Sequence, residues 1–441
     1  MTIVLLLYLA ALMAIAIRSA RRVKGIADFF VARKGASALM VAGSLVATIL
    51  GGSAVIGAVD SGARLGGAAS WFMLTGALGL LSLIPFAGRA YRHGKYALPD
   101  LVEKLYGKGP RLVASLVIPV AWTGIVAAQI IAAAKLLMTF TPLSYTTAAV
   151  TAAVVFTGYT LAGGQLSILR TDFMQAGLII AGLLLISGFA LFGNSVNVPA
   201  TIQSAPTFPF NTNFTPFDLF LLILTYGTTY TAGPDMFSRV FCAKDETTAK
   251  KAIGMAAATL IPVAFVIGFL AVYGTGLENV QGAHITAIAR QVLPQPLIPL
   301  IALALLSVVL SSADTTLLSS SVILCGLFGK AGTQLSRARL VILLNGIVAL
   351  LLALVFTDII GTLLLALAVY AGAFTIPILW GLSGMRSRPT AVAVGIVLGG
   401  LLSLAGKLCP PLPALGAHTG DILTIAAFIV NGACLFLGRT K

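Results

Sequence analysis

The sequence is poor in charge. Only 9% of its 441 residues are Asp, Glu, Lys or Arg, whereas soluble domains carry about 25%. Hydrophobic residues make up 59% of the chain, and the mean hydropathy is +1.03. This composition excludes a soluble globular domain and indicates a protein that is embedded in lipid over its whole length.

Residues that build metal centres and catalytic sites are also scarce. The four cysteines are scattered without CxxC spacing, so we interpret them as buried apolar thiols. A membrane-embedded enzyme that used a serine nucleophile would need a base beside it. The three histidines all fall in predicted loops, so we expect no enzyme: His93, His284 and His418.

Long hydrophobic runs are what the sequence has in abundance. A helix needs about 20 apolar residues to cross a bilayer, and runs of that size predict an all-α integral membrane protein with thirteen spans in a single transport domain, 1–441. The first run lacks a basic segment before it and is followed by RSARRVKG, which favours a retained helix over a cleaved signal peptide. The predicted spans are 2–18, 38–60, 66–90, 111–139, 144–163, 168–193, 216–241, 252–275, 296–326, 336–356, 358–383, 389–407 and 420–438.

The basic residues lie mostly in alternate loops. Cytoplasmic loops are enriched in Lys and Arg, so this asymmetry predicts a plasma-membrane protein with an outside N-terminus and a cytoplasmic C-terminus. Topology thereby accounts for the net charge of +15, and no nucleic-acid partner is expected. Lys135 is taken as the only basic residue inside a span. The cytoplasmic set includes Arg18, Arg21, Arg22, Lys24, Arg89, Arg92, Lys95, Arg170, Arg239, Lys244, Lys330, Arg337, Arg386, Arg439 and Lys441.

One predicted span carries a dense run of oxygen-bearing side chains, VLSSADTTLLSSSVIL, from Val309 to Leu324. With 3.6 residues per turn, Ser311, Ser312, Thr315 and Ser319 share one helix face, and Asp314 flanks it. Polar groups at membrane depth are costly and tend to be functional. A single hydroxyl more often bonds its own helix, but a run with a carboxylate inside it favours a cation site.

Two other spans contain residues that interrupt helices. Gly51-Gly52 lies at the middle of span 38–60, where unwinding would free the carbonyls from Ala47 to Leu50. Close packing through small residues is the alternative. Gly233-Pro234 interrupts TYGTTYTAGPDMFSR, which also offers the polar aromatic stripe of Tyr226, Thr229 and Tyr230. A pair of interrupted spans in corresponding positions is typical of inverted-repeat transporters.

These residues resemble the sodium:solute symporter family. Ser311-Ser312-Ala313-Asp314-Thr315 is similar to the family's Ser-Thr-Ala-Asp-Ser-type motif, and Arg170-Thr171-Asp172 with Gln175 to its Thr-Asp-x-x-Gln. Asp28-Phe29-Phe30 resembles the family's Asp-Tyr-Phe segment before core helix 1. Gly233-Pro234 together with Arg239 resembles the family's pattern in core helix 6. The resemblance implies a LeuT-type core of five plus five helices, with repeats 38–193 and 216–383, one extra helix before them (2–18) and two after them (389–438).

The resemblance also implies binding residues. The family's shared sodium site would use the carbonyls of Ala47, Leu50 and Val308 and the hydroxyls of Ser311 and Ser312. A second sodium site, or a proton site, would use Asp172, Ser311, Asp314 and Thr315, although Asp172 has an alternative role as a salt-bridge partner of Arg170 at the membrane rim. Solute contacts would come from Gly51, Ser53, Ala54, Trp122, Gln129, Tyr226, Thr229 and Tyr230. Ser53-Ala54 stands where sugar-type members carry Glu-Gln, and the acidic residue of proline-type members is missing, so neither solute is implied.

The sequence therefore predicts sodium-driven symport of a small organic solute, such as an amino acid or a carboxylate, by alternating access. Proton coupling through Asp172 and Asp314 is the alternative within transport, and a channel is a further one. The expected partners are the solute, sodium and the lipid bilayer. The oligomeric state cannot be read from the sequence.

Overall fold

The computed structural model describes residues 2–21, 23–192, 207–277, 283–328, 334–356, 358–408 and 418–440. Every regular element in these ranges is helical, as predicted. Predicted loop residues Arg22, Lys330 and Lys441 lie outside the described residues, as does Cys409. The side chain of Ser53 also lies outside the described part.

The helices follow the hydrophobic runs of the sequence. Before the predicted first repeat lie α1 (Thr2–Ala20) and α2 (Ile26–Val31), and within it lie α3 (Ala38–Ile49), η2 (Ser53–Gly57), α4 (Ala58–Asp60), α5 (Gly62–Leu65), α6 (Ser70–His93), α7 (Leu98–Tyr106), α8 (Lys108–Phe140) and α9 (Tyr145–Phe192). The rest of the chain forms α11 (Pro216–Leu222), η4 (Ile223–Gly227), α12 (Thr228–Ala232), α13 (Pro234–Cys242), α14 (Glu246–Gly274), α15 (His284–Val292), α16 (Ile298–Gly326), α17 (Leu335–Val355), α18 (Ile359–Leu382), α19 (Pro389–Leu408) and α20 (Thr419–Leu437).

The number of membrane spans differs from the predicted thirteen. Nine helices of the described chain are long and apolar enough to cross a bilayer, or ten if the bent pair of α3 and the segment 54–60 is one span. The predicted spans 144–163 and 168–193 run together as α9, and the predicted span 216–241 is divided into short helices. The count of thirteen spans stays a prediction. Two predicted spans can merge into one long helix and another can be divided into short helices, so the number of helices does not equal the number of hydrophobic runs.

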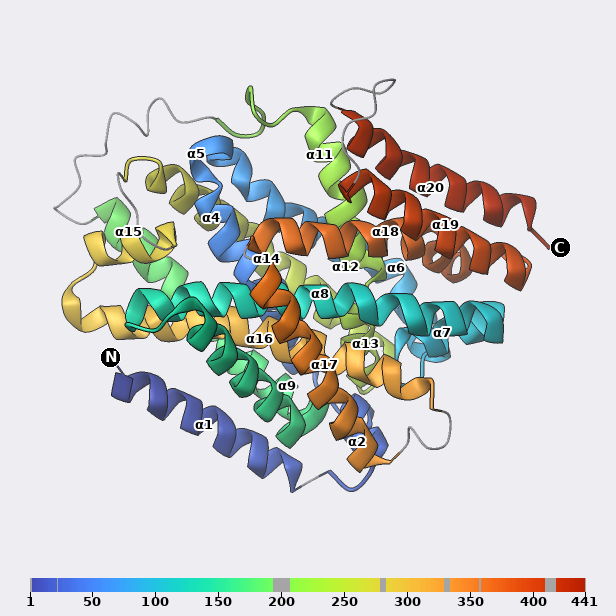
Figure 1. Ribbon diagram of the computed structural model, residues 1–441, viewed down its shortest axis with the longest axis horizontal. Helices are drawn as coiled ribbons and strands as arrows, with labels where there is room; N and C mark the ends of the chain where they lie inside the picture. The colour runs from blue at the N-terminus through green and yellow to red at the C-terminus, as the bar shows by residue number, and fades with distance from the viewer. Residues whose placement is uncertain are drawn as a thin grey trace.

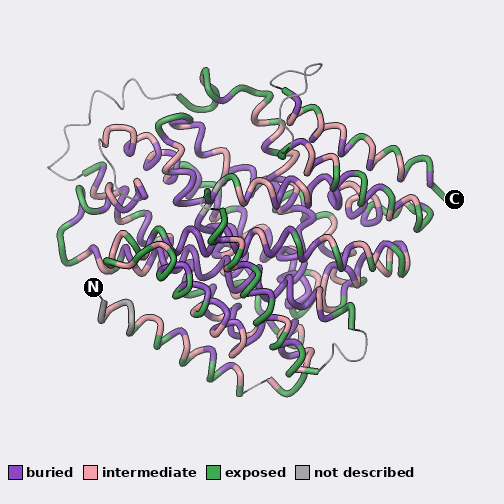
Figure 2. Tube along the Cα trace, viewed as in Figure 1, coloured by how far each residue is buried: buried purple, intermediate pink, exposed green. Residues whose placement is uncertain are grey.

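The helices differ sharply in how deeply they lie in the bundle. The most apolar windows of α8 and α16 are 78% and 72% buried, whereas that of α20 is only 28% buried. Figure 1 shows α1 along one edge of the molecule and α19 with α20 along another, and Figure 2 shows the buried residues gathered between them. Helix α16, with its run of hydroxyls, is therefore a central helix and not a lipid-facing one.

A single glycine divides α9 into two helical pieces. Gly164 has φ +60° and ψ −165°, a conformation that residues with a side chain rarely adopt. A Cβ atom there would also lie 2.6 Å from the Phe29 ring and 2.8 Å from its carbonyl oxygen. The break thus lets the segment around Phe29 in α2 pack directly against the backbone of α9.

We predict that Gly164→Ala destabilises the protein by about 1–3 kcal/mol, because alanine is strained in this positive-φ backbone conformation and there is no space for its methyl group. The melting temperature in detergent measures this effect. Gly158→Ala on the same helix is the control, since a Cβ atom at Gly158 meets nothing within 4 Å. Equal melting temperatures for the two variants would contradict the prediction.

Candidate functional site

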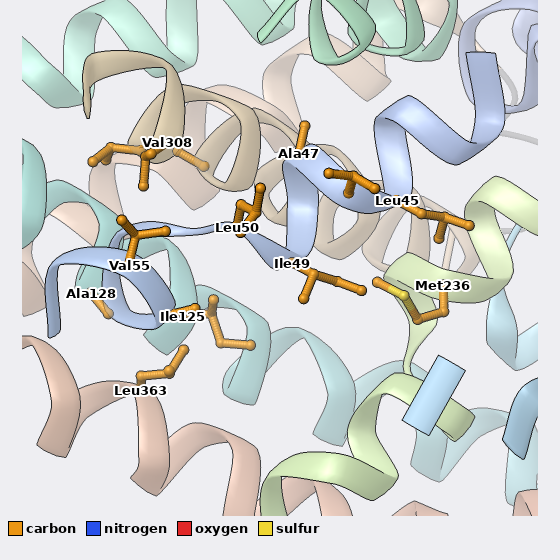
Figure 3. Close-up of a cluster of buried hydrophobic side chains, with 14 of the residues drawn as sticks. Leu45, Ala47, Ile49, Leu50, Val55, Ile125, Ala128, Met236, Val308 and Leu363 are labelled. Carbon is orange, nitrogen blue, oxygen red and sulfur yellow. The ribbon is translucent and has the colours of Figure 1, made fainter. Parts of the chain in front are cut away.

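The first interrupted helix lies where the glycine pair predicts it. Helix α3 ends at Ile49, Leu50 has the non-helical ψ of 48°, and a π-helical turn begins at Ser53. The two helical pieces meet at an angle of 54°. A Cβ atom on Gly51 would lie 2.5 Å from the Ser312 hydroxyl, so a residue without a side chain is needed where α3 meets α16. Figure 3 shows this break, with Leu50 where the ribbon of α3 stops and Val308 beside it.

Hydroxyl groups of α16 bond the carbonyl groups that the break releases. The Ser311 hydroxyl lies 2.9 Å from the Ala47 carbonyl oxygen and 3.3 Å from that of Val308. The Ser312 hydroxyl donates to the Thr48 carbonyl oxygen at 2.9 Å. Two of the predicted sodium ligands, the carbonyl oxygens of Ala47 and Val308, therefore contact a third, the Ser311 hydroxyl. Leu50 terminates the same helix, and Ser312 adjoins Ser311 on α16.

The remaining hydroxyls of α16 have different partners. Thr316 and Ser321 bond carbonyl groups one turn earlier in their own helix, each at 2.7 Å. Ser320 accepts a hydrogen bond from Asn345 of α17 at 2.8 Å. Ser319 has no partner among the described residues. The oxygen-rich run thus combines helix packing with a smaller group, Ser311 and Ser312, that faces the broken helix.

The second interruption lies at Gly233, as predicted. Gly233 is extended, with ψ 143°, between the end of α12 and the start of α13. Tyr370 of α18 donates a hydrogen bond to the Ala232 carbonyl oxygen at 2.5 Å, which satisfies the end of α12. A Cβ atom at Gly233 would lie 2.2 Å from the Thr229 carbonyl oxygen, so only glycine fits there.

The two interruptions border one small cavity of about 50 Å³. Gln129 of α8 fixes its wall by accepting a hydrogen bond from the Gly52 amide at 3.2 Å. Ala54 is buried but does not line the cavity. Six of the eight predicted solute residues do line it: Gly51, Trp122, Gln129, Tyr226, Thr229 and Tyr230.

Beside the broken α3 lies a buried ion pair that the sequence analysis did not predict. Arg239 of α13 and Asp172 of α9 are both fully buried and form a salt bridge of 3.2 Å. The Arg239 guanidinium also bonds Ser44 of α3, Ser238 and Thr315 of α16. The Ser44 hydroxyl in turn donates to Asp172 at 2.5 Å. One arginine therefore ties together α3, α9, α13 and α16.

This ion pair corrects two expectations. Asp172 does not pair with Arg170 at the rim, because its partner is Arg239, while Arg170 bonds Ser19 at 3.2 Å. Lys135 is not the only basic residue inside a predicted span, because Arg239, which the loop count had assigned to the cytoplasm, is fully buried there, whereas Lys135 is exposed. The error arose because Arg239 stands near the end of a hydrophobic run, and sequence alone does not distinguish a rim residue from one that is folded inward.

The family model for sodium:solute symporters matches residues 29–399. The chain belongs to the sodium:solute symporter family. It carries out sodium-coupled symport of a small solute, with sodium as the coupling ion. No curated protein sequence matches the chain closely enough to count as a relative.

Solved transporter structures share the symporter's fold. The chain is similar to a sodium-coupled sialic acid symporter in a substrate-bound outward-open state, with a TM-score of 0.79 and 20% identity over 100% of this chain and 98% of the other. It is also similar to a nucleobase-cation-symport-1 family transporter in a closed conformation, with a TM-score of 0.62 and 15% identity over 93% and 94% of the two chains. A manganese transporter from Eremococcus coleocola has a TM-score of 0.55 and 15% identity over 91% and 94%. These likenesses confirm the LeuT-type fold.

Two further spaces lie near the symporter's cavity. A narrow neck of about 10 Å³ is lined by Pro234, which stands between the cavity residues Gly233 and Asp235 in the chain, and by Ser238, Ser319, Phe30 and Tyr96. Phe30 and Tyr96 also line a wider vestibule of about 260 Å³, together with charged residues such as Lys104 and Arg111. The rings of Phe30 and Tyr96 contact edge to face at 6.0 Å and border the passage between the two spaces.

Two residues near the symporter's site, Asp235 and Tyr8, were not predicted from the sequence. Asp235 lines the cavity, and Tyr8 of α1 shares a 2.5 Å hydrogen bond with Ser307 of α16. Asp314 has no hydrogen-bond partner for either carboxylate oxygen within the described part of the chain. The Gly-Pro-Asp sequence at residues 233–235 marks where Asp235 lies. Nothing marks Tyr8, since a tyrosine in a first span is ordinary.

We predict that Arg239→Gln destabilises the symporter by about 3–5 kcal/mol, because it leaves the Asp172 carboxylate buried without a counter-charge. The double variant Arg239→Gln/Asp172→Asn should recover much of the lost melting temperature. Arg170→Gln is the control and should change the melting temperature little. A large loss in Arg170→Gln with none in Arg239→Gln would refute the assigned pairing.

Proposed function

We propose that the coupling sodium ion binds at the break of α3. Its ligands would be the carbonyl oxygens of Ala47, Leu50 and Val308 and the hydroxyl oxygens of Ser311 and Ser312. The observation that carries the proposal is that the Ser311 hydroxyl lies 2.9 Å from the Ala47 carbonyl oxygen and 3.3 Å from that of Val308. Hard cations prefer several oxygen ligands, and neutral oxygens bind an ion loosely enough to release it.

Sodium binding requires a rearrangement of hydrogen bonds but not of backbone. The Ser311 hydroxyl now donates to the carbonyl of Ala47, and the Ser312 hydroxyl to that of Thr48. Each carbonyl has a second lone pair, and each hydroxyl oxygen has two. Rotation of the hydroxyl hydrogen away from the ion site would present oxygen lone pairs to the ion, so the same atoms would serve the empty and the filled site.

The solute would bind in the cavity next to this ion site. Ser312 and Gly51 belong to the broken-helix contact and also line the cavity, so they link the two sites directly. The small volume favours a compact solute. Inward movement of one sodium ion gains about 2.3 kcal/mol per 100 mV of membrane potential, which can drive uptake against a gradient.

The orientation follows from the basic loops. Arg92, Lys95, Lys104 and Arg111 lie around the wide vestibule or close to it in the chain, and they belong to the predicted cytoplasmic set. We therefore place the protein in the plasma membrane with its N-terminus outside and its C-terminus in the cytoplasm, and we take the vestibule as the intracellular exit. The predicted repeats 38–193 and 216–383 would alternate access around the cavity, within one transport domain 1–441. The narrow neck at Ser319 disfavours an open channel.

Asp314 supports a second coupled cation, a sodium ion or a proton. Both of its oxygens lack a hydrogen-bond partner among the described residues, and it lies within electrostatic range of Asp172 and Arg239. The predicted second site of Asp172, Ser311, Asp314 and Thr315 must accommodate Arg239, which already donates to Asp172 and Thr315. A second cation would therefore be held chiefly by Asp314.

For the sodium site, we predict that Ser311→Ala and Ser312→Ala each raise the sodium concentration for half-maximal binding at least fivefold, since each deletes one of about five ligands. Sodium-dependent changes in intrinsic fluorescence or thermal stability of the purified protein provide the measurement. Ser321→Ala is the matched control, because this buried hydroxyl of the same helix bonds its own backbone. Unchanged sodium affinity in both site variants would disprove the assignment.

For the second cation, we predict that Asp314→Asn removes one coupled ion without abolishing sodium dependence. Uptake is measured in proteoliposomes against sodium at fixed pH and then against pH at fixed sodium. A fall in the sodium Hill coefficient would identify sodium as the lost ion, whereas a lost pH response would identify a proton. If uptake by Asp314→Asn depends on sodium and on pH as it does in the wild-type protein, Asp314 does not bind a coupled cation.

A further inference from the structure

Asp235 is the ionisable residue of the solute cavity that the proposed sodium and proton sites leave unused. It lies in the first turn of α13, just after the Gly233 break, and is 6% exposed. Its Oδ1 atom has no hydrogen-bond partner within the described part of the protein. The side chain lines the cavity, so this oxygen is an unpaired acceptor at the place where the solute is expected.

The neighbours of Asp235 do not neutralise it. Trp122 and Ser319 approach the carboxylate, but the indole nitrogen and the Ser319 hydroxyl are themselves without hydrogen-bond partners among the described residues. Arg239 stands one helical turn further along α13 and attracts Asp235 electrostatically, but its hydrogen bonds go to Ser44, Asp172, Ser238 and Thr315. Among the lining residues that the structure describes, none is Lys, Arg or His.

The charges around the cavity are unbalanced. Asp172, Asp235 and Asp314 are buried, and the one guanidinium between them belongs to Arg239. If ionised, these groups leave two negative charges in excess in a region where an uncompensated charge is costly. Arg239 pairs with Asp172 and the proposed second cation would compensate Asp314, which leaves Asp235 to a positively charged group of the solute.

The walls beside Asp235 are aromatic. Trp122 packs edge to face against Tyr370 at 4.5 Å, and Tyr226 against Tyr230 at 5.0 Å, with Trp122, Tyr226 and Tyr230 lining the cavity. Aromatic faces attract cations, most strongly when the cation is shielded from water. Aromatic rings with a carboxylate form a typical binding site for ammonium groups, whereas an anionic solute would meet repulsion from Asp235.

We propose that the solute of this symporter carries a positively charged amine or quaternary ammonium group, and that Asp235 is the specificity-determining residue that binds it beside Trp122, Tyr226 and Tyr230. This inference rests on the proposed solute cavity. It limits the solute to cations and zwitterions, such as amino acids and betaines, and excludes sugars and simple carboxylates.

The test uses pairs of compounds that share a shape and differ in charge. Purified wild-type protein is placed either in a sodium buffer or in a buffer in which potassium replaces sodium. It is then titrated with choline and with 3,3-dimethyl-1-butanol, which has a tert-butyl group in place of the trimethylammonium group of choline. Alanine and lactate form a second pair, and betaine and 3,3-dimethylbutanoate a third. We expect sodium-dependent thermal stabilisation by the nitrogen-bearing member of at least one pair, with at least tenfold weaker binding of its partner.

Variants locate this selectivity at Asp235. Asp235→Asn should weaken binding of the cationic or zwitterionic compound at least tenfold and leave that of the uncharged or anionic partner unchanged, while sodium still stabilises the protein. Asp421→Asn, the same change at a half-buried position on α20 outside the cavity lining, is the control and should behave as wild type. The wild-type comparison stands even if Asp235→Asn fails to fold.

Three results would overturn the inference and can be told apart. Sodium-dependent binding of an uncharged or anionic compound in preference to its nitrogen-bearing partner, or unchanged affinity in Asp235→Asn, would refute the role of Asp235 alone. Absence of any stabilisation by sodium would instead refute the proposed ion site, and the inference would lose its basis with it.

Discussion

A helix that is interrupted inside a membrane releases backbone groups that lipid cannot satisfy. Much of the arrangement described above follows from this constraint. Ser311 and Ser312 bond the carbonyls at the end of α3, Gln129 accepts from the Gly52 amide, and Tyr370 bonds the end of α12. Each partner comes from a neighbouring helix, so the two interruptions cannot exist without α8, α16 and α18 packed around them. The same carbonyl oxygens, partnered only by rotatable hydroxyls, are the groups that a sodium ion can use.

Charge adds a second constraint at the same depth. Arg239 links four helices through Asp172, Ser44, Ser238 and Thr315, and it leaves Asp235 and Asp314 to be compensated by something other than the described protein groups. Bound cations would supply this compensating charge, so it is present only when the transporter has bound its ion and solute. The excess negative charge would then favour joint binding of ion and solute over either alone, which is the thermodynamic content of coupling.

The sequence predicts the parts of the site that depend on local chemistry. Gly51-Gly52 and Gly233-Pro234 mark both interruptions because glycine and proline act on the backbone where they stand. Periodicity places Ser311 and Ser312 on one face, and the aromatic stripe of Tyr226, Thr229 and Tyr230 lines the cavity. Ala54 was implied as a solute contact by the family resemblance, but it lies in the π-helical turn η2 and does not line the cavity.

The parts that depend on tertiary contacts were not predicted. Asp172 has Arg170 two residues away in sequence and Arg239 beside it in space, and no local rule selects the distant partner. The partner of Ser312 is Thr48 and not one of the predicted sodium ligands, because register between α3 and α16 is set by packing at Gly51. The count of thirteen spans stays a prediction for a similar reason, since hydropathy measures runs of residues and not the breaks within them.

Reciprocal linkage between sodium and solute is the most direct test of this account. Sodium affinity is measured in the absence and presence of a saturating solute that the wild-type protein transports, and the affinity for that solute is measured without and with saturating sodium. Adjacent sites that share Ser312 and Gly51 predict that each ligand tightens the other by the same factor, at least tenfold, and that Ser312→Ala reduces both factors equally. Affinities that do not depend on the other ligand in wild-type protein would contradict the account.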